Sequence, residues 1–248
     1  MQNILEQMRD RIDNKEYKLI IGDDASGRIP TFIFRKFLKK VYGKEDAKKL
    51  QTLFFAGFGA GGELRRKINL GENGLVDKKQ KMSDFISQHS IKLNAEERVL
   101  LVTDTINTGS SIKPMIEALQ ALGYAVDVAT VGVCKINIED RTDLSDEEKT
   151  DSLKEKFNCD VFVGLHEPPE IWGKDELNGV FKFEKDLHST IIASVARDKF
   201  IVDKKVSLAR RAANEVADEL AEWYAALSSC PEFNSGDSES DNAVKKSK

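Results

Sequence analysis

The sequence contains few of the residues from which metal sites and disulfide frameworks are built. Among its 248 residues there are three cysteines and three histidines. Cys134, Cys159 and Cys230 stand far apart, with no Cys-x-x-Cys pair and no histidine at ligand spacing. This pattern argues against a zinc-finger type of site and against a disulfide-stapled domain, and it predicts reduced cytosolic thiols and no metal site built by the protein alone.

Long apolar runs and an excess of positive charge are also missing. No apolar stretch approaches membrane-spanning length, and the first residues, MQNILEQMRD, carry acid and amide groups where a signal peptide needs an apolar segment. Lys and Arg number 38 against 42 Asp and Glu, which gives a net charge of −4. We therefore expect a cytoplasmic protein with neither a membrane nor a nucleic acid among its partners.

What the sequence does contain is an alternation of apolar runs and helical patterns. The runs that predict buried strands lie at about 19–21, at 50–62 with a glycine-rich exit, at 99–102, at 124–133 and at 159–165. A capping box at Ser145 and Glu148 marks the start of one of the intervening helices. Continuous apolar strands that alternate with helices predict an α/β fold with a mostly parallel, doubly wound sheet over residues 1–200.

The C-terminal part of the chain predicts a helical extension and a tail. Residues 201–229 predict one long helix, in which apolar residues recur at three-four spacing: Val206, Ala209, Ala213, Val216, Leu220, Trp223 and Leu227. Such a stripe forms either a homodimer seam or a cover for its own domain, and the small and aromatic members favour the cover slightly. Residues 230–248 are rich in Ser, Asp, Asn and Lys and are expected to be disordered.

Polar or glycine-rich segments follow three of the predicted strands, at 23–28, 57–62 and 103–111. Ligands of open parallel sheets bind beyond the carboxyl ends of the strands, so we expect these segments to share one site. The segment 57–62 satisfies Gly-x-Gly-x-x-Gly, but residues 63–67 do not begin an apolar-periodic helix, which makes a dinucleotide site the weaker interpretation. No Gly-x-x-x-x-Gly-Lys-Ser/Thr motif of a P-loop enzyme is present.

The segment 103–111 combines an acid with a phosphate-binding pattern. Thr108, Gly109, Ser110 and Ser111 precede an apolar-periodic helix, where backbone amides and hydroxyls can bind a phosphate. Asp104 would repel phosphate, but its carboxylate can accept hydrogen bonds from two sugar hydroxyls or hold a metal-bound water. The pattern therefore indicates a ribose 5-phosphate; the alternative is that Thr108 or Ser110 only caps the helix.

The whole segment from Val99 to Ser111 resembles the signature of type I phosphoribosyltransferases. That signature has four apolar residues, two acids, two apolar residues, a variable position, Thr-Gly and two small or hydroxyl residues. The loop Asp24-Ala25-Ser26-Gly27-Arg28 is similar to the first-strand loop of the family. The resemblance covers about residues 17–165, and it implies transfer of ribose 5-phosphate from 5-phosphoribosyl 1-diphosphate to a nucleobase-like acceptor.

The resemblance also implies roles for individual residues. Asp104 would be the catalytic residue that holds the ribose hydroxyls, and Thr108 to Ser111 would hold the 5-phosphate. Asp24, Ala25, Ser26 and Gly27 would carry the diphosphate, with Arg28 as a counter-charge and Mg²⁺ arriving with the diphosphate. In the family a mobile loop and a base-recognising hood follow; here they would be 63–81, with Arg65 near the diphosphate, and about 166–185, with Trp172 stacked on the base. A solvated loop and a packed tryptophan are the alternatives.

Two positions depart from the family pattern. Thr103 stands where the first of the paired acids is expected, so one ribose carboxylate is missing. Asn107 stands where the branch that uses 6-oxopurines has an acid, and an amide cannot act as a general base. These departures argue against a hypoxanthine–guanine enzyme, and they leave a second interpretation, a non-catalytic protein of the same fold that senses such a ligand or serves as a scaffold.

Overall fold

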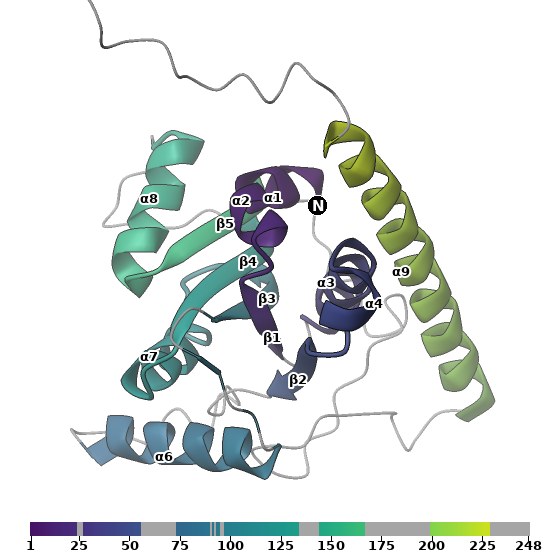
Figure 1. The fold of residues 1–248 in the computed structure, drawn as a ribbon. Coiled ribbons are helices and arrows are strands. Elements are labelled where there is room, and N and C mark those ends of the chain that lie inside the picture. Colours follow the sequence, from purple (N-terminus) through teal and green to yellow (C-terminus); the bar gives the residue numbers. More distant parts are fainter. Residues whose placement is uncertain are drawn as a thin grey trace, which may run out of the picture.

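The computed structural model describes residues 1–23, 27–55, 73–89, 91, 93–94, 97–133, 144–166 and 199–228. These residues form one five-stranded sheet in which every neighbouring pair of strands is parallel. The strands are β1 (Tyr17–Asp23), β2 (Gln51–Phe55), β3 (Arg98–Ile106), β4 (Ala125–Val133) and β5 (Asp160–His166), in the order β2-β1-β3-β4-β5. The predicted α/β fold with a parallel sheet is confirmed for this part of the chain (Figure 1).

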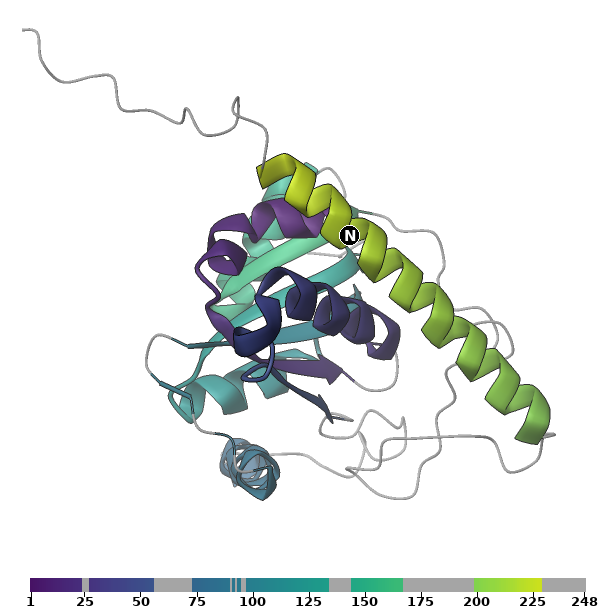
Figure 2. The ribbon, with the colours of Figure 1, turned by 45° about the vertical axis from the view of Figure 1, so that its right-hand side comes forward.

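Helices cover both faces of the sheet. They are α1 (Gln2–Gln7), α2 (Arg9–Asp13), α3 (Arg28–Val41), α4 (Gly43–Asp46), α6 (Asn73–Gln88), α7 (Lys113–Ala121), α8 (Asp146–Phe157) and α9 (Lys199–Ser228). Residues of α6, α7 and α8 form one buried cluster with the sheet, and residues of α1, α2, α3 and α9 form another. Figure 2 shows α9 running along the outside of α3.

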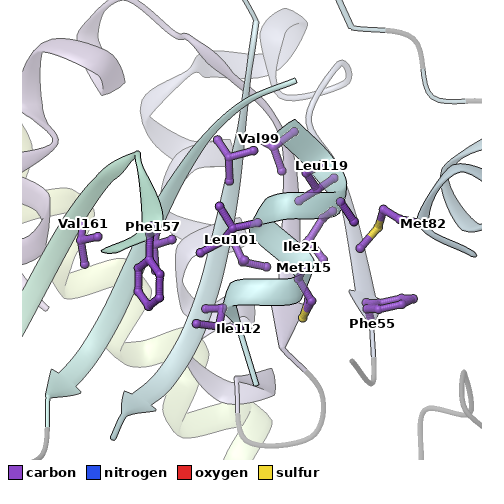
Figure 3. Packing of buried hydrophobic residues seen from close by; sticks show 14 of the residues in the cluster. Ile21, Phe55, Met82, Val99, Leu101, Ile112, Met115, Leu119, Phe157 and Val161 are labelled. Atoms are coloured by element: carbon purple, nitrogen blue, oxygen red, sulfur yellow. The ribbon is translucent and has the colours of Figure 1, made fainter. Parts of the chain in front are cut away.

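Alternating side chains of the central strand β3 enter these two clusters. Val99 and Leu101 pack on the side of α7, as Figure 3 shows, whereas Leu100 and Val102 pack on the side of α3. All four are fully buried. A strand covered on both faces has no solvent side to carry polar residues, which is why its sequence is a continuous apolar run.

The amino-terminal ends of the strands are tied by a buried ion pair. The carboxylate of Asp127 on β4 is fully buried and accepts hydrogen bonds from Arg98 Nε at 2.8 Å and Nη2 at 2.6 Å. The hydroxyl of Tyr17 on β1 donates to the same carboxylate at 2.9 Å, and burial with this neighbouring charge raises the tyrosine pKa. This cluster joins β1, β3 and β4 at the edge opposite to the predicted site.

The long C-terminal helix packs on its own domain in the structure. Among the residues of α9 whose side chains the structure describes, Ala213, Ala217, Leu220 and Tyr224 are buried. The Tyr224 ring meets Phe37 of α3 edge-on, with ring centroids 5.4 Å apart. Ala213 and Leu220 of the predicted stripe are buried, whereas Val216 is 37% exposed, so the buried face only partly coincides with the predicted one. The homodimer remains untested.

Other sequence predictions differ from the structure near element ends. A loop is predicted over 63–81, but α6 already begins at Asn73, and its buried Met82 and Ile86 anchor the helix against the core. Of the predicted hood at 166–185, the structure describes only residue 166. The tail at 230–248 lies outside the described residues. None of the helices described combines the length and apolar character that crossing a membrane requires.

Candidate functional site

The carboxyl ends of the adjacent strands β1 and β3 bring two of the three predicted segments together. β1 and β3 are adjacent, and Gly22 is paired with Val102. Asp23 therefore ends β1 beside Thr103. The third segment, 57–62, lies outside the described residues, as do Asp24, Ala25, Ser26, Arg65 and Trp172.

The turn that leaves β1 is pressed against β3. The amide of Gly27 donates to the carbonyl oxygen of Asp23 at 2.7 Å. A Cβ added at Gly27 would lie 2.6 Å from the carbonyl oxygen of Val102 and 2.7 Å from that of Asp23. Glycine is needed here for close approach of two backbones, since its φ of −73° suits any residue. Arg28 follows as the first residue of α3, and its guanidinium lies over the Phe54 ring at 5.3 Å.

Thr103 and Asp104 form the acidic part of the site. Thr103 is buried, and its hydroxyl donates to Asp23 Oδ2 at 3.2 Å, with Asp104 Oδ1 at 3.4 Å. Asp104 is partly buried, and its Oδ1 also accepts the amide of Thr105 at 2.6 Å. The carboxylates of Asp23 and Asp104 therefore both lie near the Thr103 hydroxyl, at the carboxyl ends of β1 and β3.

The loop from Asn107 to Ser111 exposes polar side chains beside these carboxylates. Asn107, Thr108, Ser110 and Ser111 are exposed, whereas Gly109 is buried with a φ of +70°. The Thr108 hydroxyl lies 3.0 Å from that of Ser110 and accepts the Ser110 amide at 3.4 Å. The residues thus form a compact turn whose hydroxyls face solvent.

The structure does not support helix capping as the role of these hydroxyls. α7 begins at Lys113, later than the sequence suggests, and its N-cap position is Ile112, where no side chain makes a capping hydrogen bond. The Gly109 carbonyl accepts the Lys113 amide at 2.9 Å, which joins the turn to the helix. The capping interpretation of Thr108 and Ser110 is therefore wrong for this geometry.

Helix α8 supports the loop from outside the sequence motif. Lys156 Nζ donates to the carbonyl oxygen of Thr108 at 2.7 Å. A Cβ on Gly109 would lie 2.6 Å from Cζ of the buried Phe157. These two contacts join segments about 48 residues apart in sequence, so local pattern could not reveal them. Asp23 lies in the predicted segment 23–28, but no role of its own was predicted for it.

A hollow of about 440 Å³ lies at the opposite edge of the sheet. Arg98, Gln120, Tyr124, Lys154 and Cys159 are among its lining residues. Burial raises the pKa of Cys159 to about 12, so this thiol stays protonated and unreactive at neutral pH. Nowhere in the described ranges do three or more His, Cys, Asp or Glu side chains gather where they could hold a metal ion.

Comparison of the chain with protein-family models, with curated proteins and with solved structures found no match. The function is therefore argued from the residues of this chain and from the geometry that brings them together. That geometry joins two carboxylates, a close backbone turn and a loop of exposed hydroxyls at one edge of a parallel sheet.

Proposed function

We propose that the carboxyl edge of β1 and β3 binds 5-phosphoribosyl 1-diphosphate and that the chain is a type I phosphoribosyltransferase. The reaction would transfer ribose 5-phosphate to a nitrogen of a nucleobase-like acceptor, with diphosphate as the leaving group. The observation that carries the proposal is the loop 107–111, whose hydroxyls are exposed directly after the partly buried carboxylate of Asp104.

The loop has the properties of a phosphate site. Thr108, Ser110 and Ser111 supply hydroxyl donors, and the positive φ of Gly109 turns the backbone toward the start of α7. The amino-terminal end of a helix carries a partial positive charge, which favours an anion. Because α8 fixes the loop through Lys156, these donors are held in place before the ligand binds.

The carboxylate edge suits the sugar. A carboxylate accepts strong, charge-assisted hydrogen bonds from ribose hydroxyls, and Asp104 lies in sequence between Val102, whose carbonyl oxygen closely approaches Gly27, and the loop 107–111. Loss of diphosphate leaves positive charge on the ribose carbon, and a nearby carboxylate stabilises that charge. The oxygen donors of Asp23 and Asp104 also suit Mg²⁺, which would arrive with the diphosphate and neutralise part of its charge.

A second candidate is a protein that binds the same ligand without turnover. It is favoured by the exposed amide of Asn107, which cannot remove a proton from a base. Thr103, whose hydroxyl is engaged by Asp23, supplies no carboxylate of its own. Release of diphosphate in the presence of a panel of nucleobases separates the candidates: the transferase releases it with at least one base, and the binding protein with none.

Ligand-induced stabilisation tests the shared binding step. A ligand at one hundred times its Kd stabilises the folded state by about 2.7 kcal/mol, which for a chain of this size raises Tm by roughly 5–10 °C. Phosphoribosyl diphosphate with Mg²⁺ should produce this shift. Ser111→Asp should abolish it, because a carboxylate would repel the 5-phosphate. Ala121→Asp adds the same charge at the far, exposed end of α7 and should retain it. Absence of any wild-type shift at millimolar ligand would refute the proposal.

A further inference from the structure

The end of β1 is placed to supply a carboxylate that the motif on β3 lacks. Ile21 and Leu101 lie in the same buried cluster, so they occupy the same face of the sheet. Side chains alternate along a strand, and therefore Asp23 and Thr103 emerge on that face as well. Since Gly22 pairs with Val102, the two side chains are also neighbours across the strands.

One hydroxyl links this carboxylate to Asp104. Thr103 Oγ1 lies 3.2 Å from Asp23 Oδ2 and 3.4 Å from Asp104 Oδ1. A hydroxyl carries a single hydrogen, so it can donate fully to one of these oxygens at a time. The carboxylates of Asp23 on β1 and Asp104 on β3 thus both lie close to the Thr103 hydroxyl, at the carboxyl ends of these strands.

We infer that Asp23 is the second ribose-binding carboxylate of the site, taking the place of the acid that is absent at Thr103. The inference rests on the proposed function. With Asp23 and Asp104 together, the two ribose hydroxyls can each donate to a separate carboxylate. A second negative charge near the ribose carbon also stabilises the positive charge that develops there.

The inference gives a physical reason for threonine at position 103. An acid there would stand in contact with Asp23, and two carboxylates at hydrogen-bonding distance repel each other unless one is protonated. The threonine hydroxyl instead donates to Asp23 and holds it toward Asp104. Asp23 and Thr103 together therefore replace the paired acid of the family pattern: the carboxylate comes from β1, and the residue on β3 is the threonine that binds it.

Calorimetric titration with two ligands tests the role of Asp23. Ribose 5-phosphate presents both the phosphate and the sugar hydroxyls, whereas inorganic phosphate engages only the loop. Asp23→Asn keeps the shape of the side chain and removes its charge. The variant loses the charge-assisted hydrogen bond from a ribose hydroxyl to Asp23. The affinity for ribose 5-phosphate should therefore fall about ten- to a hundredfold. The affinity for inorganic phosphate should stay the same or rise, because a negative charge has been removed.

Other outcomes separate a structural role from failure of the proposed function. Equal loss of affinity for both ligands, or unchanged affinity for ribose 5-phosphate, would overturn the inference about Asp23. A wild-type protein that binds neither ligand would refute the proposed function itself. If Asp23→Asn does not fold, Thr103→Val removes only the bridging hydroxyl and should weaken ribose 5-phosphate more than phosphate; equal weakening would count against the inference. Recovery of ribose 5-phosphate binding in Asp23→Asn/Thr103→Asp would support it.

Discussion

Replacement of Gly109 by alanine should distort the phosphate loop for two separable reasons. The residue has a φ of +70°, a conformation that costs an L-residue about 1–2 kcal/mol. The new Cβ would also lie 2.6 Å from Cζ of Phe157, and such overpacking costs about 1–3 kcal/mol. We expect a total loss of about 2–5 kcal/mol, measured by denaturant unfolding, together with loss of ribose 5-phosphate binding.

Gly123 provides the matched control. Its φ is +87°, but a Cβ there would meet nothing within 4 Å. Gly123→Ala should therefore cost only the backbone strain of about 1–2 kcal/mol and leave ligand binding intact. In a Phe157→Leu background the contact is removed, and Gly109→Ala should then cost about as much as Gly123→Ala. An equal cost of Gly109→Ala in both backgrounds would refute the role of Phe157 in fixing the loop.

Three further substitutions test the packing and the support of the site. Leu220→Asp places a charge on the buried face of α9 and should cost several kcal/mol in thermal unfolding, whereas Val216→Asp, at a position 37% exposed, should cost little; similar costs would contradict the observed face. Arg98→Met should lower stability by about 3 kcal/mol, because the buried Asp127 keeps only the Tyr17 hydroxyl and the more distant Arg11 Nε at 3.5 Å as partners, and an unchanged denaturation midpoint would disprove this. Lys156→Met removes a hydrogen bond to the loop and should weaken ribose 5-phosphate binding by about two- to tenfold at nearly constant Tm; unaltered affinity would show that the loop needs no support.

The order of strands and helices could be predicted from the sequence because its signals are local. Each strand is built around a short apolar run, and the capping box at Ser145 and Glu148 is present in the structure with both of its hydrogen bonds. Gly123 follows the C-cap of α7 and has the positive φ that glycine commonly adopts just after a helix. These features depend on neighbouring residues, so the pattern alone reveals them.

The parts that could not be predicted depend on packing between distant segments. The start of α6 was misplaced because Asn73 and Gly74 are poor helix formers and residues 77–81 are all polar, whereas its described core contacts come later, from Met82, Phe85 and Ile86. The buried face of α9 is set by α3, which selects Ala217 and Tyr224 over the predicted Val216. At the site, the sequence shows a missing acid at Thr103, whereas the structure places Asp23 beside it through the register of two strands.

A crystal structure with phosphoribosyl diphosphate and Mg²⁺ tests the central claim most directly. We expect the 5-phosphate within hydrogen-bonding distance of the hydroxyls and amides of 108–111, and the ribose hydroxyls on Asp104 and Asp23. Binding of the ligand instead in the hollow near Arg98 and Lys154, at the other edge of the sheet, would contradict the claim. So would crystals that remain free of ligand at concentrations of several millimolar.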